Sequence, residues 1–249
     1  MAQLRQAITV RRRGQPFPVS VTFDDDLASH VLVALPVLRR LELPACFFVS
    51  GASGGGRRPF WWERLDHALR QVGFSAVAAL AASVCSELGR STTPLGLAEA
   101  VEAMDAERRR RLDRALERLG GPSAVDTLRG QDVRAIVEGG FDVGFHTRSH
   151  PSLPDLADAS MVAALTDGRE ELAALVGAEI TTLAYPFGRA DARVALAARA
   201  AGYQLAFTTE PRPIATSSDP MLLGRLEAPS DSAGRLALRL LRTLLRRAP

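Results

Sequence analysis

Residues 19–26 read Val19-Ser20-Val21-Thr22-Phe23-Asp24-Asp25-Asp26. The β-branched and aromatic residues of this stretch predict a strand, and three carboxylates follow where the strand ends. One aspartate would suffice to cap a following helix. Three adjacent carboxylates repel one another unless a cation or a basic side chain lies close to them. The stretch therefore predicts a strand that ends either in a helix cap or in a metal site.

Strands and helices alternate through much of the rest of the chain. Further strands are expected at 45–49, 141–145, 181–185, 205–208 and 222–227, and helices at 30–41, 132–138, 159–176 and 191–201. This alternation predicts an α/β fold with a parallel sheet, and a barrel is the favoured closure for 249 residues. We expect one domain spanning 1–249, with a helical insertion at about 53–123. In such a barrel, functional side chains lie at the carboxyl ends of the strands.

The composition excludes several classes of chemistry. All 31 basic residues are arginine, so the chain has no lysine for a Schiff base or a phosphate-binding P-loop. Two cysteines form neither a disulfide framework nor a cysteine-based zinc site. A net charge of +3 gives no reason to expect nucleic acid as a partner. Because we find no signal-peptide pattern and no apolar run near the roughly 20 residues that span a bilayer, we expect a cytoplasmic protein.

Two of the four histidines follow the strand expected at 141–145, in the run His146-Thr147-Arg148-Ser149-His150-Pro151. Histidines four residues apart can direct both imidazoles to one point, as in many zinc sites, although two ordinary surface histidines would also fit. Combined with the aspartates at 24–26, they give two histidines and one carboxylate. That set leaves coordination positions open for water and substrate.

A third cluster, Tyr185-Pro186-Phe187-Gly188, ends the strand expected at 181–185. Proline and glycine turn the chain sharply there, and the turn can leave a backbone N–H directed into the mouth of the barrel. A plain connection from strand to helix is the alternative.

In this order, the three clusters resemble the first three motifs of the polysaccharide deacetylase family, carbohydrate esterase family 4 with its chitooligosaccharide deacetylase homology domain. The resemblance is to the subgroup with a Tyr-Pro-Phe-Gly third motif, and it runs from about residue 19 to residue 227, apart from the helical segment. It implies a distorted (β/α)7 barrel with the insertion after the second strand. It also implies metal-dependent removal of N- or O-acyl groups from sugars.

Carried over residue by residue, the resemblance makes Asp25, His146 and His150 the ligands of one divalent metal ion. Zinc is the first expectation, and cobalt, nickel or iron also suit such a set. Asp24 would be the general base, and the backbone N–H of Phe187 would bind the oxyanion. Further residues expected to contact the substrate are Tyr185, Pro186, Arg225 and Trp61.

The sequence departs from the family pattern at several places. Asp26 stands where the first motif usually has glycine. Ala184 stands where many members have an arginine that orients the base, and Arg225 or Arg189 is the expected replacement. No histidine follows His150, so the family's late catalytic acid is missing.

We therefore expect a hydrolase that removes an N-acyl group, foremost N-acetyl, from a sugar or glycan in glycan or glycoconjugate biosynthesis. Removal of a formyl group from a formamido sugar is an alternative. The departures motivate a second alternative, a non-catalytic protein that binds metal or glycan.

Two segments outside the motifs carry further expectations. Trp61 and Trp62 belong to a lid that stacks on sugar rings, or they pack onto the barrel. A C-terminal helix at about 234–247 places four arginines along one stripe and leucines opposite; the arginines are Arg235, Arg239, Arg242 and Arg246. Such a helix closes the barrel with its apolar face, or it contacts an anionic membrane surface peripherally.

Overall fold

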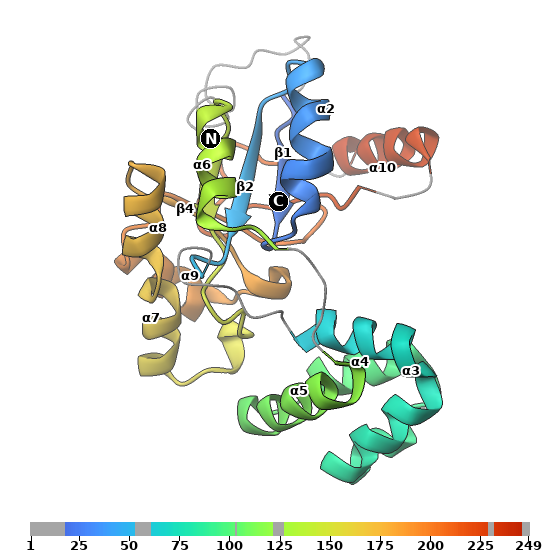
Figure 1. Cartoon of the computed structure of the whole chain (residues 1–249). Helices are drawn as coiled ribbons and strands as arrows, with labels where there is room; N and C mark the ends of the chain where they lie inside the picture. The colour runs from blue at the N-terminus through green and yellow to red at the C-terminus, as the bar shows by residue number, and fades with distance from the viewer. Residues whose placement is uncertain (1–17, 53–60, 103, 122–126, 229–231, 246–249) are drawn as a thin grey trace. The chain divides into compact units, whose positions relative to one another are not determined.

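A computed structural model describes residues 18–52, 61–102, 104–121, 127–228 and 232–245 (Figure 1). Five parallel strands form one sheet in the order of the chain: β1 (Val21–Asp24), β2 (Ala45–Val49), β3 (Asp142–Phe145), β4 (Thr182–Ala184) and β5 (Leu205–Phe207). The sheet is half of a barrel, which confirms the α/β barrel class expected from the sequence. The strand expected at 222–227 is reduced to one parallel bridge between Phe207 and Leu223.

Helices connect successive strands of this sheet. They are the π-helix η1 (His30–Ala34), α2 (Leu35–Arg40), α6 (Gly130–Glu138), α7 (Asp158–Thr166), α8 (Arg169–Val176) and α9 (Ala192–Ala200), with 3-10 turns η3 (Leu153–Asp155) and η4 (Pro186–Gly188). The helix expected at 159–176 is two helices because Gly168 adopts a left-handed φ of 87° between them. Pro36 is the second residue of α2, which follows the π-helix η1 without a break.

Strand β2 shows how the sheet is buried on both faces. Alternate residues Ala45, Phe47 and Val49 belong to the large core that the helices cover, whereas Cys46 and Phe48 belong to a smaller cluster on the opposite face. All five residues of β2 are buried. Because both faces are apolar, polar side chains of this region are left to the strand ends and the loops that follow them.

Residues 58–127 form a compact unit of their own, and the rest of the chain forms the other. The helical unit contains α3 (Trp61–Val84), η2 (Ser86–Arg90), α4 (Pro94–Glu102) and α5 (Ala106–Gly120). Helix α3 is broken at Gly73, where φ is 80°. A separate hydrophobic core, which includes Leu65, Leu97 and Leu116, holds this unit together. The single-domain organisation expected from the sequence stays a prediction.

The last described element is α10 (Ala233–Leu245), close to the expected 234–247. Ser232 caps it, because its Oγ accepts a hydrogen bond of 3.1 Å from the N–H of Arg235. Arg246 lies outside the described residues. Within the part of the chain that the structure describes, we find no helix with the length and apolar character needed to cross a membrane. The cytoplasmic location stays a prediction.

Candidate active site

Two strand ends of the sheet bring together the three side chains that the sequence predicted as metal ligands. The Nε2 atoms of His146 and His150 lie 3.1 Å apart. Oδ1 of Asp25 lies 3.6 Å from Nε2 of His146 and 3.7 Å from Nε2 of His150. Two nitrogen ligands at about 2.0–2.1 Å from a tetrahedral zinc ion stand roughly 3.3 Å apart, so the spacing of the two imidazoles fits such an ion. Among the described residues, these three form the group with metal-ligand geometry.

The orientation of His146 also suits a ligand. Its Nδ1 lies 2.8 Å from the carbonyl oxygen of Ala184, at the end of β4. With the proton on Nδ1, the ring donates to that carbonyl and leaves the lone pair of Nε2 directed at Asp25 and His150. The neighbouring strand therefore selects the tautomer that a metal ion requires.

The backbone around these residues is strained. Four non-glycine residues here have left-handed φ values: Asp25 (70°), Thr147 (60°), His150 (47°) and Phe187 (57°). Among the described residues, one other non-glycine residue has a positive φ, Glu42 at 53°. Such conformations cost about 1–3 kcal/mol each and persist where the surroundings enforce them. Their concentration in the loops at this sheet edge is typical of a functional site.

Asp24, the predicted base, accepts two hydrogen bonds from Arg225. The guanidinium donates from Nη1 to Oδ1 and from Nη2 to Oδ2, each at 2.6 Å. Arg225 is itself held by the carbonyl of Thr208 and the hydroxyl of Thr22, both at 3.2 Å. Burial alone would raise the pKa of Asp24, but the hydrogen bonds and the charge of Arg225 lower it below its usual value. Asp24 is therefore kept ionised and fixed in orientation.

The other candidate for orienting the base does not reach it. Arg189 pairs with Asp155 at 3.4 Å, and both side chains are more than half exposed. Of the two arginines that the sequence offered for orienting the base, Arg225 is therefore the one that contacts Asp24.

Asp26 points away from the ligand set. Its carboxylate is fully buried and accepts hydrogen bonds from the backbone N–H of Ser50, at 2.8 Å, and from the Ser50 hydroxyl. The first helix begins after Ser29 with no capping side chain, so the helix-cap interpretation of Asp24–Asp26 is wrong. Sequence reasoning missed Ser50, although its position directly after the apolar run of β2 is a signal for a residue at this edge.

The first two side chains of the third motif, Tyr185 and Pro186, are buried. Tyr185 is fully buried, and its hydroxyl donates to the carbonyl of Met221 at 2.9 Å. Pro186 is buried as well. Both side chains are used inside the fold, and their contact with substrate stays a prediction.

Phe187 and Gly188 complete this turn beside the ligand set. The Phe187 ring packs edge-on against His150, with centroids 4.4 Å apart at 78°. Gly188 has a φ of 65°, and a Cβ there would lie 2.1 Å from Oγ1 of Thr209, so this position requires glycine. The turn thus fixes the strained Phe187, whose N–H as an oxyanion donor stays a prediction.

The two remaining histidines have other partners. His30 is buried against the rings of Phe23 and Phe47, at centroid distances of 5.4 and 5.6 Å, and burial lowers its pKa to about 4 against the opposing charge of Asp24. Nε2 of His67 lies 3.1 Å from the carbonyl oxygen of Gly120 in the helical unit. His30 is therefore a neutral packing residue.

Trp61 belongs to the helical unit. Its ring meets that of Trp62 edge-on at 5.6 Å, and the Arg109 guanidinium lies 5.9 Å from its centroid. Its contact with substrate stays a prediction.

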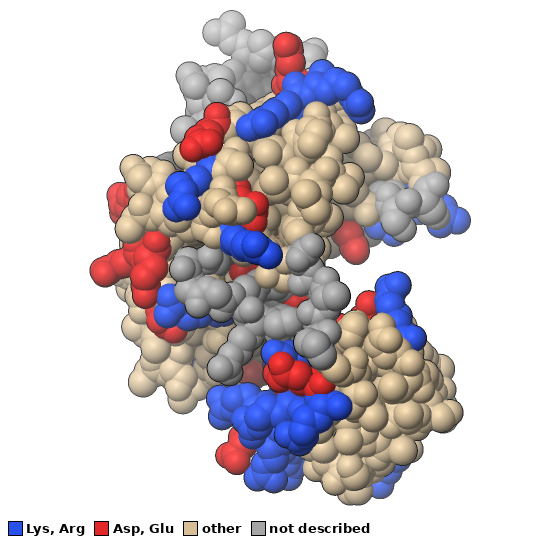
Figure 2. All heavy atoms as spheres, viewed as in Figure 1, with Lys and Arg blue, Asp and Glu red and all other residues tan. Residues whose placement is uncertain are grey.

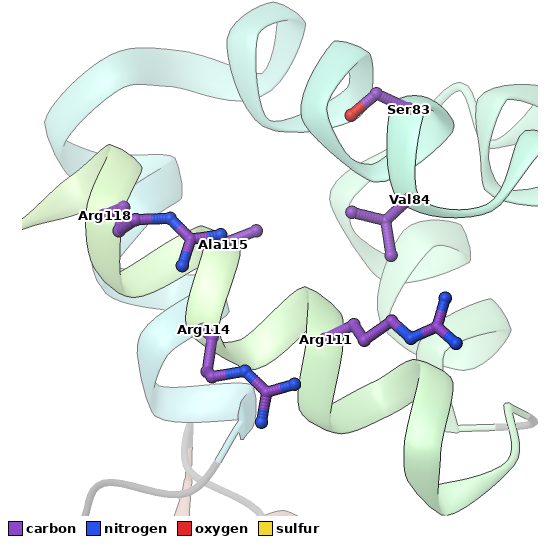
Figure 3. A pocket seen from close by; sticks show the side chains of 6 residues that line it. All are labelled: Ser83, Val84, Arg111, Arg114, Ala115 and Arg118. Carbon is purple, nitrogen blue, oxygen red and sulfur yellow. The ribbon is translucent and has the colours of Figure 1, made fainter.

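The helical unit also contains a surface hollow of about 330 Å³, formed between α5 and the end of α3 (Figure 3). Arg111, Arg114 and Arg118 of α5 line it together with Ser83 and Val84 of α3. None of the predicted site residues lines the hollow.

Comparisons with known proteins agree with this geometry. Residues 96–206 match the family model described as polysaccharide deacetylase, a range that includes both ligand histidines and the Tyr-Pro-Phe-Gly turn but not Asp24 and Asp25. No curated protein matches the chain.

Several solved structures share the fold. The Streptococcus pyogenes deacetylase PplD in complex with acetate has a TM-score of 0.62 at 16% identity, over 98% of this chain and 78% of that one. The de-N-acetylase from Aggregatibacter actinomycetemcomitans has a TM-score of 0.57 at 13% identity, over 95% and 80% of the two chains. IcaB from Ammonifex degensii has a TM-score of 0.54 at 19% identity, over 90% and 75%. Residues 96–206 are therefore similar to the polysaccharide deacetylase family, and the solved structures share the fold of the chain.

Proposed function

We propose that this chain is a metal-dependent carbohydrate N-deacetylase, of the subgroup with a Tyr-Pro-Phe-Gly third motif, acting on an N-acetylated sugar in glycan or glycoconjugate biosynthesis. The single observation that carries the proposal is the convergence of Asp25, His146 and His150 beside an Asp24 that Arg225 fixes. This arrangement combines a three-ligand set that leaves positions open with an ionised carboxylate next to it. The names of the similar structures, a deacetylase and a de-N-acetylase, agree with it.

Asp25, His146 and His150 would hold one divalent ion, zinc before cobalt, nickel or iron. When bound, that ion would polarise the acyl carbonyl and make a water more acidic. The donor set fits this role because His146 presents Nε2 with Nδ1 committed to the Ala184 carbonyl.

Asp24 would take a proton from the attacking water, whose oxygen adds to the acyl carbon. The paired hydrogen bonds from Arg225 hold both carboxylate oxygens in place, so the orientation of the base is set before substrate arrives. The lowered pKa of Asp24 keeps it unprotonated and available to accept that proton near neutral pH.

The rest of the reaction needs an oxyanion donor and a proton for the leaving amine. The N–H of Phe187, in the strained turn against His150, would donate to the oxyanion. As the C–N bond breaks, Asp24 would return its proton to the amine nitrogen, which releases an amino sugar and acetate. This route replaces the late histidine that the chain lacks.

The experiment is a product assay on the purified protein after incubation with Zn²⁺ or Co²⁺. N-acetylated and N-formylated sugars and oligosaccharides are supplied, and released acid and free amine are both measured. We expect acetate and amine in equal amounts, and loss of both in Asp24→Asn while bound metal is retained. Formate in place of acetate would make the chain a deformylase. Metal binding without any released acid would make it a non-catalytic member.

A further inference from the structure

Helix α10 has an apolar face that no hydrophobic core covers. Its leucines include Leu236, Leu238, Leu240 and Leu241, and none of them belongs to a core cluster of the described residues. Leu238 and Leu241 are 45% and 54% exposed, and Leu236 and Leu240 are partly buried without joining a core. An amphipathic helix normally buries its apolar side, so an uncovered one marks a surface that meets something else.

The opposite side of α10 is uniformly basic. Arg235, Arg239 and Arg242 follow one another at helical spacing along one stripe, and Ala233–Leu245 contains no acidic residue. Arg239 donates to the backbone carbonyl of Glu227 at 3.2 Å, which leaves its charge unneutralised. Arg242 has no ion-pair partner among the residues that the structure describes. The positive charges of Arg239 and Arg242 therefore lie on a helix whose other side is apolar.

Helix α5 shows that a helix rich in basic residues need not expose an apolar side. Figure 2 shows basic side chains gathered over α5. There, however, Glu107, Asp113 and Glu117 stand among the arginines, and Leu112 and Leu116 are buried in the core of the helical unit. The basic residues of α5 are the solvated side of a packed helix, whereas α10 presents both of its sides.

We propose that α10 docks on an anionic lipid surface, with its leucines at the boundary between headgroups and acyl chains and its arginines against lipid phosphates. A lipid layer covers the leucines and neutralises Arg239 and Arg242 at the same time. A second copy of α10 could cover the leucines but has no acidic residue to offer the arginines. The proposal goes beyond the hydrolase activity and does not depend on it.

The test is sedimentation of the full-length protein with two kinds of vesicle. One is phosphatidylcholine alone, and the other is phosphatidylcholine mixed with phosphatidylglycerol. We expect binding to the mixed vesicles only, weakened by added salt because the attraction is electrostatic. Each arginine near an anionic surface strengthens binding about fivefold, so R239E/R242E should weaken binding at least roughly 25-fold.

Two matched controls separate the helix from general effects. R110E/R114E on α5 makes the same change in net charge and should leave binding unchanged. L238S/L241S should abolish binding without lowering the Tm, because both leucines are about half exposed and belong to no core. Leu196→Ser, at a leucine of α9 that is 68% exposed, should leave vesicle binding intact.

Several outcomes would overturn the proposal. Equal binding to both kinds of vesicle, or full binding by R239E/R242E, would remove the role of anionic lipid. A Tm lowered by L238S/L241S would show that the chain itself covers this face. A dimer in gel filtration that L238S/L241S converts to a monomer would assign the face to a second copy.

Discussion

The two compact units of the chain use their polar side chains differently. At the carboxyl edge of the sheet, His146 and His150 are buried, and the loops that carry the site hold four non-glycine residues at positive φ. In the described part of the helical unit, no non-glycine residue has a positive φ. Its ion pairs include local ones such as Arg70 with Asp66 and Arg111 with Glu107, each four residues apart and largely exposed.

The contacts at the sheet edge instead join distant parts of the chain. Arg225 and Asp24 are 201 residues apart, and His146 and Ala184 are 38 apart. Strained backbone conformations cost free energy and persist only where the surrounding structure enforces them. Exposed local ion pairs, in contrast, contribute little to stability. The difference teaches that activity should be sensitive to changes at the sheet edge and insensitive to changes in the polar contacts of the helical unit.

The largest effect is expected from removal of a metal ligand. Asp25→Ala and His146→Ala should each lose the bound ion, since two remaining ligands hold a divalent ion poorly. A metal ion supplies several kcal/mol of transition-state stabilisation, and about 1.4 kcal/mol corresponds to tenfold in rate, so activity should fall by at least roughly 100-fold.

Metal content of the purified variants, measured by elemental analysis beside wild type, checks this prediction. His67→Ala in the helical unit is the control and should keep the metal. Wild-type metal content in either ligand variant would show that the ion binds elsewhere.

The next effect is expected at Arg225, which contacts Asp24 rather than the ligand set. Arg225→Ala should keep its metal but lose activity by roughly 10–100-fold, the range typical of residues that orient a catalytic group. Arg225→Lys should not restore the rate, because one ammonium cannot hold both carboxylate oxygens. Arg189→Ala removes an exposed pair and should be unchanged in kcat. A normal kcat in Arg225→Ala would contradict the positioning role.

A smaller effect is expected at Ser50, which lies at the same edge of the sheet. Here we expect a change in the free energy of unfolding. Ser50→Ala removes the hydroxyl donor of the buried Asp26 carboxylate and should destabilise the fold by about 1–3 kcal/mol. Chemical denaturation measures this, with Ser83→Ala as the matched control because Ser83 is exposed and bonds its own helix. Equal midpoints for the two variants would show that the Asp26 contact contributes nothing.

Much of this edge could be predicted because parallel strands end on the same side of a sheet. An apolar run followed by polar residues marks such an end locally. Two of these runs sufficed to place the aspartates at 24–26 near His146 and His150, and the choice of Asp25 among the three aspartates came from the resemblance to the polysaccharide deacetylase family. The α/β barrel class followed from the same alternation of strands and helices.

The partners of individual side chains could not be predicted, since they depend on contacts between distant segments. The residues next to Asp26 in the sequence do not indicate that Ser50 is its hydrogen-bond partner. Tyr185 stands in a motif beside the site, yet its hydroxyl bonds to a carbonyl 36 residues away, and that contact buries it. Likewise, residues 222–227 look like a strand, but they pair with β5 through a single bridge at Leu223.

The smallest effect on activity is expected from Arg64 in the helical unit. Its side chain is 6% exposed and joins α3 to α5 through Asp113 at 3.2 Å and Glu117 at 2.5 Å. Arg64→Ala leaves both carboxylates without this cation, but they are partly exposed and remain hydrated, so the cost should be about 1–3 kcal/mol, less than for a fully buried pair. Metal content and kcat, measured below the unfolding transition, should equal those of wild type. A loss of metal in Arg64→Ala would show that the helical unit supports the sheet edge, and the two units would then not differ as their contacts indicate.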